Sequence, residues 1–317
     1  MERQLGEISD FLLGLHGDAR ALEPDAFQRA ILERLRTLVP FDFAAWGGAE
    51  AEERQVNEVL VLDQDQRILT EWPEVGPLDR FCDLTLEGLN RTWHFDDIPG
   101  YRDTLAYNEH WRGFEVSHMM STIMHEPLEG YVSFMGLFHE DMARPFTEEE
   151  RALKQLLMPH LAEALRTNRE WTVAAAGEPA EGTALVDGTG RILASRDPFR
   201  ALLREEWGTH HPLRLPEVLA GARAGGPAWR GRCIQIRIRR FHHNFLLRVR
   251  PLSPLDALPP RAREVAELFG AGLSHKEVAR RLGLSPATVR KQLTNIYERL
   301  GISSKAALGR LIRPDAD

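Results

Sequence analysis

Residues 274–301 are SHKEVARRLGLSPATVRKQLTNIYERLG, and the spacing of serines and glycines in this stretch decides how it folds. Ser274 and Glu277 stand three residues apart, which is the spacing of a capping box and predicts the start of a helix that Gly283 ends. A serine followed by a proline then predicts a second helix, which ends at Gly301. Two short helices joined by a tight turn that contains glycine are typical of a helix-turn-helix, so we expect a DNA-binding module here.

The second of these helices separates an apolar face from a polar one. At about 100° per residue, one narrow stripe collects Val289, Leu293, Ile296 and Leu300, which we expect in the core. Residues near the amino end of a recognition helix reach base edges, which predicts base contacts from Arg290, Lys291 and Thr294. We expect phosphate contacts from Lys276, Thr288 and Arg299. The alternative is a basic face that is only solvated, and the intact helix-turn-helix pattern favours DNA.

Further motifs surround these helices, in residues 261–265, 272–279, 284–290 and 295–301. Through them, residues 258–312 resemble the LuxR/FixJ family of helix-turn-helix regulators. The resemblance implies an all-α domain of four helices, the last at about residues 303–312, and a dimer that binds two half-sites. It also implies dimerisation through Leu308, Leu311 and Ile312.

Four positions depart from the family pattern: Pro259, Ala262, Gln292 and Ala307. The family usually has threonine at the first, an acidic residue at the second, histidine at the third, and often an acidic residue near the fourth. The first of the four helices, expected at about residues 260–269, therefore lacks its usual cap. These departures concern operator preference and domain stability, and none removes an expected base contact.

The charge of the chain is distributed unevenly. Residues 256–317 hold eleven Lys and Arg against seven Asp and Glu, a net +4, which leaves −11 for residues 1–255 out of a total of −7. An acidic body with a basic tail suits a regulator that contacts DNA only through its tail. The chain shows neither a long apolar span nor a secretory signal, so we expect a cytoplasmic protein without membrane contact. Cys82 and Cys233 are far apart, which excludes a disulfide framework or a zinc knuckle.

The length of 317 residues favours several domains, and we expect an α+β multidomain protein. Residues 1–171 mix helix and strand patterns and resemble a GAF-like sensor domain. Residues 172–180 are small and include Gly and Pro, which predicts a linker. Residues 181–252 resemble a short, degenerate PAS-like α+β segment, and residues 255–317 form the helix-turn-helix domain.

Periodicity predicts the elements of the first two segments. In the first segment, helices are expected at residues 5–15, 27–38 and from 147 onward, and strands at residues 41–46, 58–62, 116–124 and 131–138. The last two strands are expected to form a hairpin through residues 126–130, and Thr147 and Glu150 have capping-box spacing. In the second segment, strands are expected at residues 184–187 and 192–194, a helix at 197–206, and a hairpin of strands at 234–239 and 247–249.

Large aromatic and sulfur-containing side chains are dense in the first segment, and such side chains often line apolar ligand pockets. The candidates for ligand binding are Trp46, Trp72, Phe81, Trp93, Tyr101, Tyr107, Trp111, Met120 and Met124, with Met119 beside them. Ordinary core packing is the alternative, and the sequence does not separate the two. Residues 93–101 do not reproduce the Trp, Tyr and Asp-Pro set of acyl-homoserine-lactone receptors. Receiver and cyclic-nucleotide signatures are also absent.

Other chemistry has no good candidate in the sequence. The spacings of His118, His125, His139 and His160 match no metal or haem motif, so we expect structural histidines and neither a metal nor a cofactor. No nucleophile–base pair or paired carboxylates stand out, so we do not expect an enzyme. Seven arginines lie between residues 230 and 250, and the sequence leaves three interpretations of them open. They extend the DNA contact, or they form the solvated face of a hairpin, or they dock against the acidic first segment.

These patterns together predict a sequence-specific transcriptional regulator. The leading hypothesis is a one-component activator controlled by a small apolar or aromatic effector bound in the first segment. Its expected partners are a double-stranded DNA operator, a second copy of the chain and RNA polymerase. The alternative is a constitutive or protein-partner-controlled regulator without a small-molecule ligand.

Overall fold

The computed structural model describes residues 2–126, 130–178, 181–208, 213–220, 226 and 228–312, and the side chains from residue 5 onward. The chain divides into two compact units, one of residues 1–231 and 236–250, the other of residues 232–235 and 251–317. No helix within the described ranges is long and apolar enough to cross a membrane.

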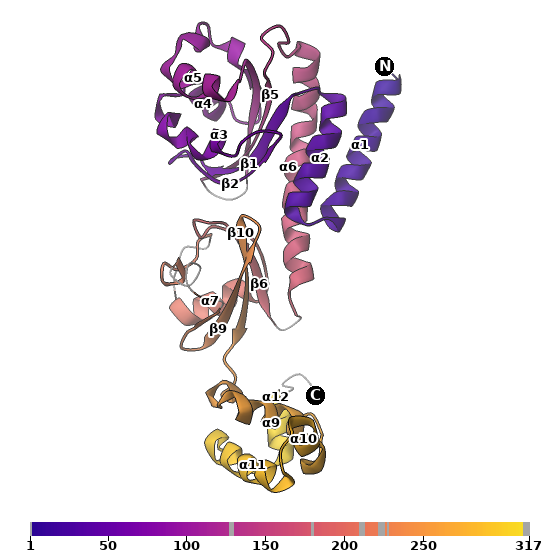
Figure 1. Cartoon of the computed structure of the whole chain (residues 1–317), viewed down its shortest axis with the longest axis vertical. Coiled ribbons are helices and arrows are strands. Elements are labelled where there is room, and N and C mark those ends of the chain that lie inside the picture. The colour runs from indigo at the N-terminus through magenta and orange to yellow at the C-terminus, as the bar shows by residue number, and fades with distance from the viewer. Residues whose placement is uncertain are drawn as a thin grey trace. The chain divides into compact units, whose positions relative to one another are not determined.

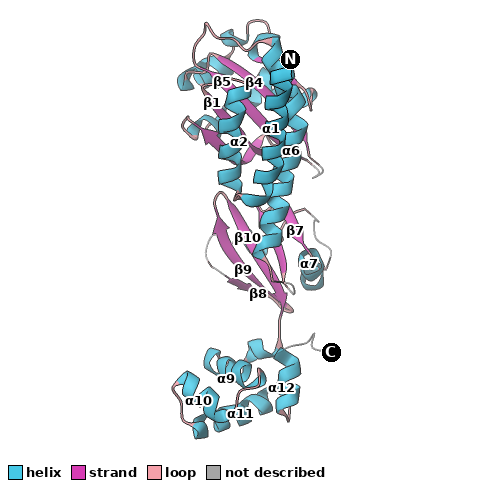
Figure 2. Cartoon of the chain, turned by 90° about the vertical axis from the view of Figure 1, so that its right-hand side faces the viewer, coloured by secondary structure: helices cyan, strands magenta, loops and turns pink. Residues whose placement is uncertain are grey.

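The first unit begins with an antiparallel sheet of order β2-β1-β5-β4-β3. Its strands are β1 (Phe43–Glu50), β2 (Gln55–Leu62), β3 (Thr92–His94), β4 (His118–His125) and β5 (Tyr131–His139). The helices α1 (Glu2–Ala21), α2 (Pro24–Leu38) and α6 (Glu148–Ala176) lie side by side along one face of this sheet (Figures 1 and 2).

Short helices cover the opposite face of the first sheet. They are α3 (Arg67–Thr70), α4 (Arg80–Glu87), α5 (Leu105–Glu109) and the 3-10 turns η1 (Trp72–Glu74), η2 (Gly76–Leu78), η3 (Phe95–Asp97), η4 (Tyr101–Asp103) and η5 (Trp111–Phe114). Because both faces are covered, the central strands are buried on both sides, and two separate apolar cores form. The sheet thus stands between a helical core and a second core of short, aromatic-rich segments.

Within the same unit a second antiparallel sheet has the order β7-β6-β10-β9-β8. Its strands are β6 (Gly182–Val186), β7 (Ile192–Arg196), β8 (Ala228–Arg230), β9 (Ile234–Phe241) and β10 (Asn244–Pro251), and α7 (Phe199–Trp207) follows β7. The last turns of α6 pack against β6 and β7.

The described part of the carboxy-terminal unit from residue 254 onward is helical. It contains η6 (Pro254–Ala257), α9 (Pro260–Gly270), α10 (His275–Leu282), α11 (Pro286–Leu300) and α12 (Lys305–Ile312) around one apolar core. The α+β multidomain class with a helical carboxy-terminal domain is confirmed.

The structure contains elements that the sequence pattern did not predict, among them the short helices α3–α5 and the strands β3 and β8, and it moves one expected boundary. Residues 172–176, expected in a linker, are the last turns of α6, because alanines favour a helix and no glycine interrupts it before Gly177. The turn expected between β4 and β5 falls partly on residues 127–129, outside the described residues. At the start of α6 the capping box is present as expected, with the Thr147 side chain accepting from the Glu150 amide.

Candidate nucleic-acid interface and ligand cavity

Local hydrogen bonds hold the start of α10 and the turn between α10 and α11. The Ser274 hydroxyl accepts from the Glu277 amide at 3.3 Å, and the Glu277 carboxylate accepts from the Ser274 amide at 2.7 Å. This amide donor lowers the pKa of Glu277. Gly283 adopts a left-handed conformation with φ of 66°, which a side chain would strain, and the Leu284 amide donates to the Ala279 carbonyl at 2.9 Å. The expected capping box and turn are therefore present.

The faces of α11 follow its sequence pattern. Val289, Leu293 and Ile296 are buried in the core of the unit, and Leu300 is half-buried at its edge. The Arg290 and Lys291 side chains are exposed and form no hydrogen bond or ion pair with another described residue. Their cationic groups are thus available to acceptors outside the chain.

The threonines of α11 are less free than the sequence suggested. The Thr294 hydroxyl donates to the Arg290 carbonyl of its own helix at 3.2 Å, so it offers its methyl group and acceptor lone pairs to a partner. The Thr288 hydroxyl pairs with the Ser285 hydroxyl at 2.8 Å within the helix cap. Lys276 and Arg299 are exposed, as a phosphate contact requires.

Lysine and arginine side chains that the sequence pattern did not single out also shape this unit. Arg280 and Arg281 are exposed in the last turn of α10 and add two cations to the same unit. The Lys305 ammonium donates to the carbonyls of Gly272 and Leu273, each at 2.8 Å, and lies 4.4 Å from the centre of the Phe269 ring. Lys305 therefore fastens the start of α12 to the turn after α9. Its partners are about thirty residues away, so no local spacing pointed to it.

The dimerisation residues expected on α12 take different positions. Leu308 is fully buried in the core of its own unit, where it lies beside Gly270 of α9, so it is not available to a second chain. Ile312 is half-buried and also packs against Gly270. Leu311 is half-buried outside this core and is the remaining candidate for a dimer contact.

A cavity lies between the first sheet and its short helices, with about 80 Å³ of free volume. Its sheet wall has small residues in adjacent strands, because Ala45 of β1 and Ser121 of β4 are both register partners of Gly136 of β5. The opposite wall carries three aromatic side chains, Trp72, Phe81 and Trp111, which we term the aromatic cover. The cavity exists because the small residues of the sheet leave space beneath this cover.

Asp79 holds the aromatic cover together. Its carboxylate accepts from the indole N–H groups of Trp72 at 3.1 Å and Trp111 at 3.2 Å, from the Tyr101 hydroxyl at 2.7 Å, and from the Phe81 amide at 2.9 Å. Burial, followed by the Asp79 charge, raises the pKa of Tyr101, so its hydroxyl stays a donor. Four hydrogen-bond donors on one buried carboxylate therefore hold the aromatic cover in place. The sequence pattern gave no indication of this role of Asp79.

The nine ligand-binding candidates divide between the two faces of the sheet. Trp72, Phe81 and Trp111 line the cavity, whereas Tyr101, Tyr107 and Trp93 belong to the surrounding core without lining it. Trp46, Met120 and Met124 lie on the opposite face, packed among the long helices, so they are core residues there. Strand side chains alternate between faces, which is why Met119 lines the cavity and its neighbour in sequence does not.

Other cavity residues had no signal in the sequence. Ser121 is buried and its hydroxyl forms no hydrogen bond with another described residue. Cys82 also lines the cavity, and burial raises the pKa of its thiol to about 12, so the thiol remains protonated. The cavity is thus apolar, with one hydroxyl left without a partner.

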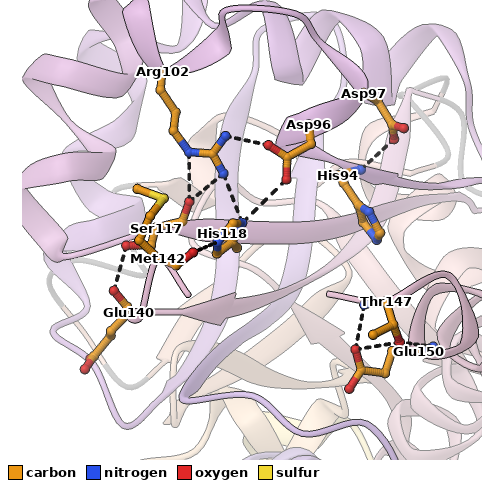
Figure 3. A network of polar contacts seen from close by, with 10 residues as sticks. All are labelled: His94, Asp96, Asp97, Arg102, Ser117, His118, Glu140, Met142, Thr147 and Glu150. Carbon is orange, nitrogen blue, oxygen red and sulfur yellow. Dashed lines mark hydrogen bonds and ion pairs between the residues drawn. The ribbon is translucent and has the colours of Figure 1, made fainter. Parts of the chain in front are cut away.

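Of the four histidines named from the sequence, His118, His139 and His160 contact other protein groups, whereas His125 is exposed. In Figure 3 the His118 ring lies between Arg102 and the loop after β5: Nδ1 is 3.0 Å from an Arg102 nitrogen, and Nε2 is 3.0 Å from the Met142 carbonyl. His139 Nδ1 lies 3.1 Å from the Asp42 carboxylate, and His160 meets the His16 ring edge-on. Within the described ranges, no three His, Cys, Asp or Glu side chains are placed to hold a metal.

Buried ion pairs join the two sheets of the first unit. Glu50, at the end of β1, accepts from Arg191 Nε at 2.6 Å and from Arg214 at 2.8 Å, and both Glu50 and Arg191 are only 4% exposed. Glu58 of β2 is paired with the buried Arg169 of α6 and accepts from Asn244 of β10 at 2.8 Å. The arginines that pair with Glu50 and Glu58 at this junction therefore do not come from the arginine-rich residues 230–250.

Comparison with known proteins adds the family of the carboxy-terminal domain. Residues 256–312 match the family model described as bacterial regulatory proteins, luxR family. The HTH-type transcriptional regulator Mb0914c of Mycobacterium bovis is 43% identical over 61 residues, which are 19% of this chain and 7% of that protein. The transcriptional regulatory protein UhpA of Escherichia coli is 46% identical over 55 residues, 17% of this chain and 28% of UhpA. The chain therefore spans less than a third of either relative.

Two solved structures are remotely similar to larger parts of the chain. Escherichia coli SdiA aligns over 96% of this chain and 99% of its own, with 12% identity and a TM-score of 0.38. The ligand-binding domain of VqsR from Pseudomonas aeruginosa aligns over 51% and 94%, with 18% identity and a TM-score of 0.36. The firm assignment is that of the last unit, which contains a LuxR-type helix-turn-helix domain.

Proposed function

We propose that this protein is a sequence-specific transcriptional regulator that contacts its operator through α11. The proposal rests on the side chains of Arg290 and Lys291, which are exposed and not ion-paired to a described residue. They lie on a capped helix whose opposite face is buried in the core. Both side chains can donate to guanine O6 and N7, and each good contact contributes roughly 1–3 kcal/mol of discrimination. Lys276 and Arg299 supply charge for phosphate contacts without sequence preference.

The test is selection of an operator from random duplexes with the full chain, followed by binding titrations. The double variant Arg290→Ala, Lys291→Ala should lose discrimination between operator and scrambled DNA. Lys276→Ala should weaken both by a similar factor and reduce the salt slope by about one unit. Arg166→Ala, which removes an exposed arginine of α6, is the matched control. It should change neither the operator preference nor the salt slope. Unaltered operator preference in the double variant would refute the assignment of base contacts.

The same proposal includes an effector in the cavity, so that the chain acts as a one-component activator. The effector class that fits is a small apolar or aromatic molecule, because the cavity walls are aliphatic and aromatic and Ser121 offers a single free hydroxyl. Glu50 also lines this cavity and forms an ion pair with Arg191 beside the second sheet. This ion pair physically connects the cavity to the second sheet, so a bound ligand can act on that sheet through Glu50. The GAF-like and PAS-like assignments of the two sheets, the homodimer and an RNA polymerase contact remain predictions within this proposal.

Trp111→Phe tests the effector half. It removes an indole from the cavity wall, so it should alter the transcriptional response to a cell extract while leaving basal DNA affinity unchanged. Trp46→Phe is the matched control, because Trp46 is equally buried but lies on the opposite face of the sheet. Equal effects of the two variants would show that the response depends on stability and not on the cavity.

A second candidate is a constitutive or protein-partner-controlled regulator. The size of the cavity favours it, because about 80 Å³ is well below the roughly 300–1,000 Å³ of ligand pockets. Native mass spectrometry of the full chain separates the two functions. A bound small molecule supports the first, whereas a mass equal to that of the bare chain, together with a co-purified protein, supports the second.

A further inference from the structure

A second, more polar hollow lies where the ends of α1 and α6 meet the β9–β10 hairpin. It has a volume of about 350 Å³, and we term it the arginine groove. The end of α6 lies beside this hairpin in Figure 2. Arg20, Arg239 and Arg248 line the groove from three separate elements, together with Trp171 and Phe241. Two of these arginines come from the run of residues 230–250 whose role the sequence left open.

The three arginines of the groove lack anionic partners. None of their guanidinium groups forms an ion pair or a hydrogen bond with another described residue. The buried arginines of the same unit behave differently, since Arg169 and Arg191 are each bound to a glutamate. The one carboxylate in the lining, Glu23, lies 3.2 Å from the His242 ring. The groove therefore gathers three guanidinium groups, none of them ion-paired to a described residue, against one carboxylate.

Helix ends reduce this charge but do not cancel it. The carboxyl ends of α1 at Ala21 and α6 at Ala176 both line the groove. Each helix end carries about half a negative charge, so the two ends together offset about one of the three guanidinium charges, and the Glu23 carboxylate offsets another, which leaves a net positive groove. Close positive charges on neighbouring strands repel each other, and an anion in the groove relieves that repulsion.

The groove also offers aromatic surface. Trp171 is 49% exposed although it is one of the largest apolar side chains of the unit. Phe241 is half-buried, and the Arg239 guanidinium lies 5.4 Å from the centre of its ring. A ligand with a flat apolar body would cover these rings while its anionic group meets the arginines.

We propose that the arginine groove binds an organic anion with an aromatic or flat apolar body, such as an aryl carboxylate. This site is separate from the cavity of the first sheet, and it does not depend on the effector proposed for that cavity. Contact with DNA phosphates is the competing use of these arginines. The exposed Trp171 and the hollow between helix ends favour a small ligand over a duplex.

The test uses the full chain and two probes that share one ring system, 2-naphthoate and the neutral 2-naphthalenemethanol, in calorimetric titrations. Naphthoate should bind once per chain, at least about tenfold more tightly than the alcohol, with a Kd that rises with salt. The double variant Arg239→Gln, Arg248→Gln should weaken naphthoate by about tenfold or more. Arg237→Gln is the matched control, because Arg237 is exposed on the same strand without lining the groove, and it should leave the Kd unchanged.

Any one of three results would overturn the proposal. The first is that naphthoate does not bind saturably, and the second is that 2-naphthoate and 2-naphthalenemethanol bind with equal affinity. The third is that Arg239→Gln, Arg248→Gln binds naphthoate as tightly as the wild-type chain does. A further competition experiment adds short duplex DNA to the naphthoate complex. If the DNA displaces naphthoate equally well from the wild-type chain and from Arg237→Gln, the groove belongs to nucleic acid and the proposal is wrong. Circular dichroism of each variant confirms that the glutamines leave the fold intact.

Discussion

Replacing Asp79 by asparagine should weaken the hydrogen bonds that hold the aromatic cover. One carboxylate oxygen accepts both indole N–H groups, from Trp72 and Trp111, and the other accepts from Tyr101 and the Phe81 amide. Asparagine has only one oxygen, so in either orientation its NH₂ group faces two donors. In the first orientation the NH₂ group faces the indoles, and both indole N–H groups lose their acceptor. In the second it faces Tyr101 and Phe81, where the Tyr101 hydroxyl can turn to accept from it, and only the Phe81 amide loses its acceptor.

The magnitude follows from these contacts. A hydrogen bond to a charged group contributes roughly 1.5–3 kcal/mol, and Asp79 is only 1% exposed, so solvent does not replace the lost partners. The first orientation loses two long indole bonds, of 3.1 and 3.2 Å, and the second loses one amide bond of 2.9 Å. The free energy of unfolding of the first unit should therefore fall by about 1.5–3 kcal/mol.

Urea unfolding of the full chain, followed by near-ultraviolet circular dichroism of the tryptophans, measures this loss. The matched control is Asp83→Asn, which breaks the ion pair with Arg54 at a side chain that is 45% exposed and should cost less than about 1 kcal/mol. A loss below 1 kcal/mol for Asp79→Asn, or equal losses for both variants, would refute the anchoring role of Asp79.

Three other changes test the packing and charges of the first unit. Gly136→Ala places a methyl group 2.8 Å from the Phe138 ring and should cost about 1–3 kcal/mol in urea unfolding; an unchanged midpoint would contradict the tight contact. Glu58→Ala leaves Arg169 buried without its anion and should cost about 3–5 kcal/mol, with a smaller loss expected for Glu58→Gln. Burial lowers the pKa of His110 from 6.5, so the unfolded chain takes up the proton first. The free energy of unfolding should therefore fall as the pH drops below about 6.5, and His110→Gln should flatten this dependence; an identical pH profile in the variant would argue against it.

Much of the carboxy-terminal unit could be predicted from the sequence, because its signals are local. The capping box of Ser274 and Glu277 and the left-handed turn at Gly283 each involve residues within about one helical turn. The face of α11 that joins the core follows from helical periodicity alone. Leu308 shows the limit of that reasoning, because its burial depends on α9, nearly forty residues earlier in the chain.

The cavity required the tertiary structure. Periodicity identified strands but not which of their two faces would meet the helices, so Met120 was expected to bind ligand although it faces the other core. Asp79 gathers donors that lie up to 32 residues away along the chain, and Glu50 meets Arg191 from 141 residues away. The sequence by itself determined the capped helices and their polar face, since hydrogen bonds between near neighbours form them. Only folding decided the cavity, the buried ion pairs and the arginine groove, because each requires distant segments to be brought together.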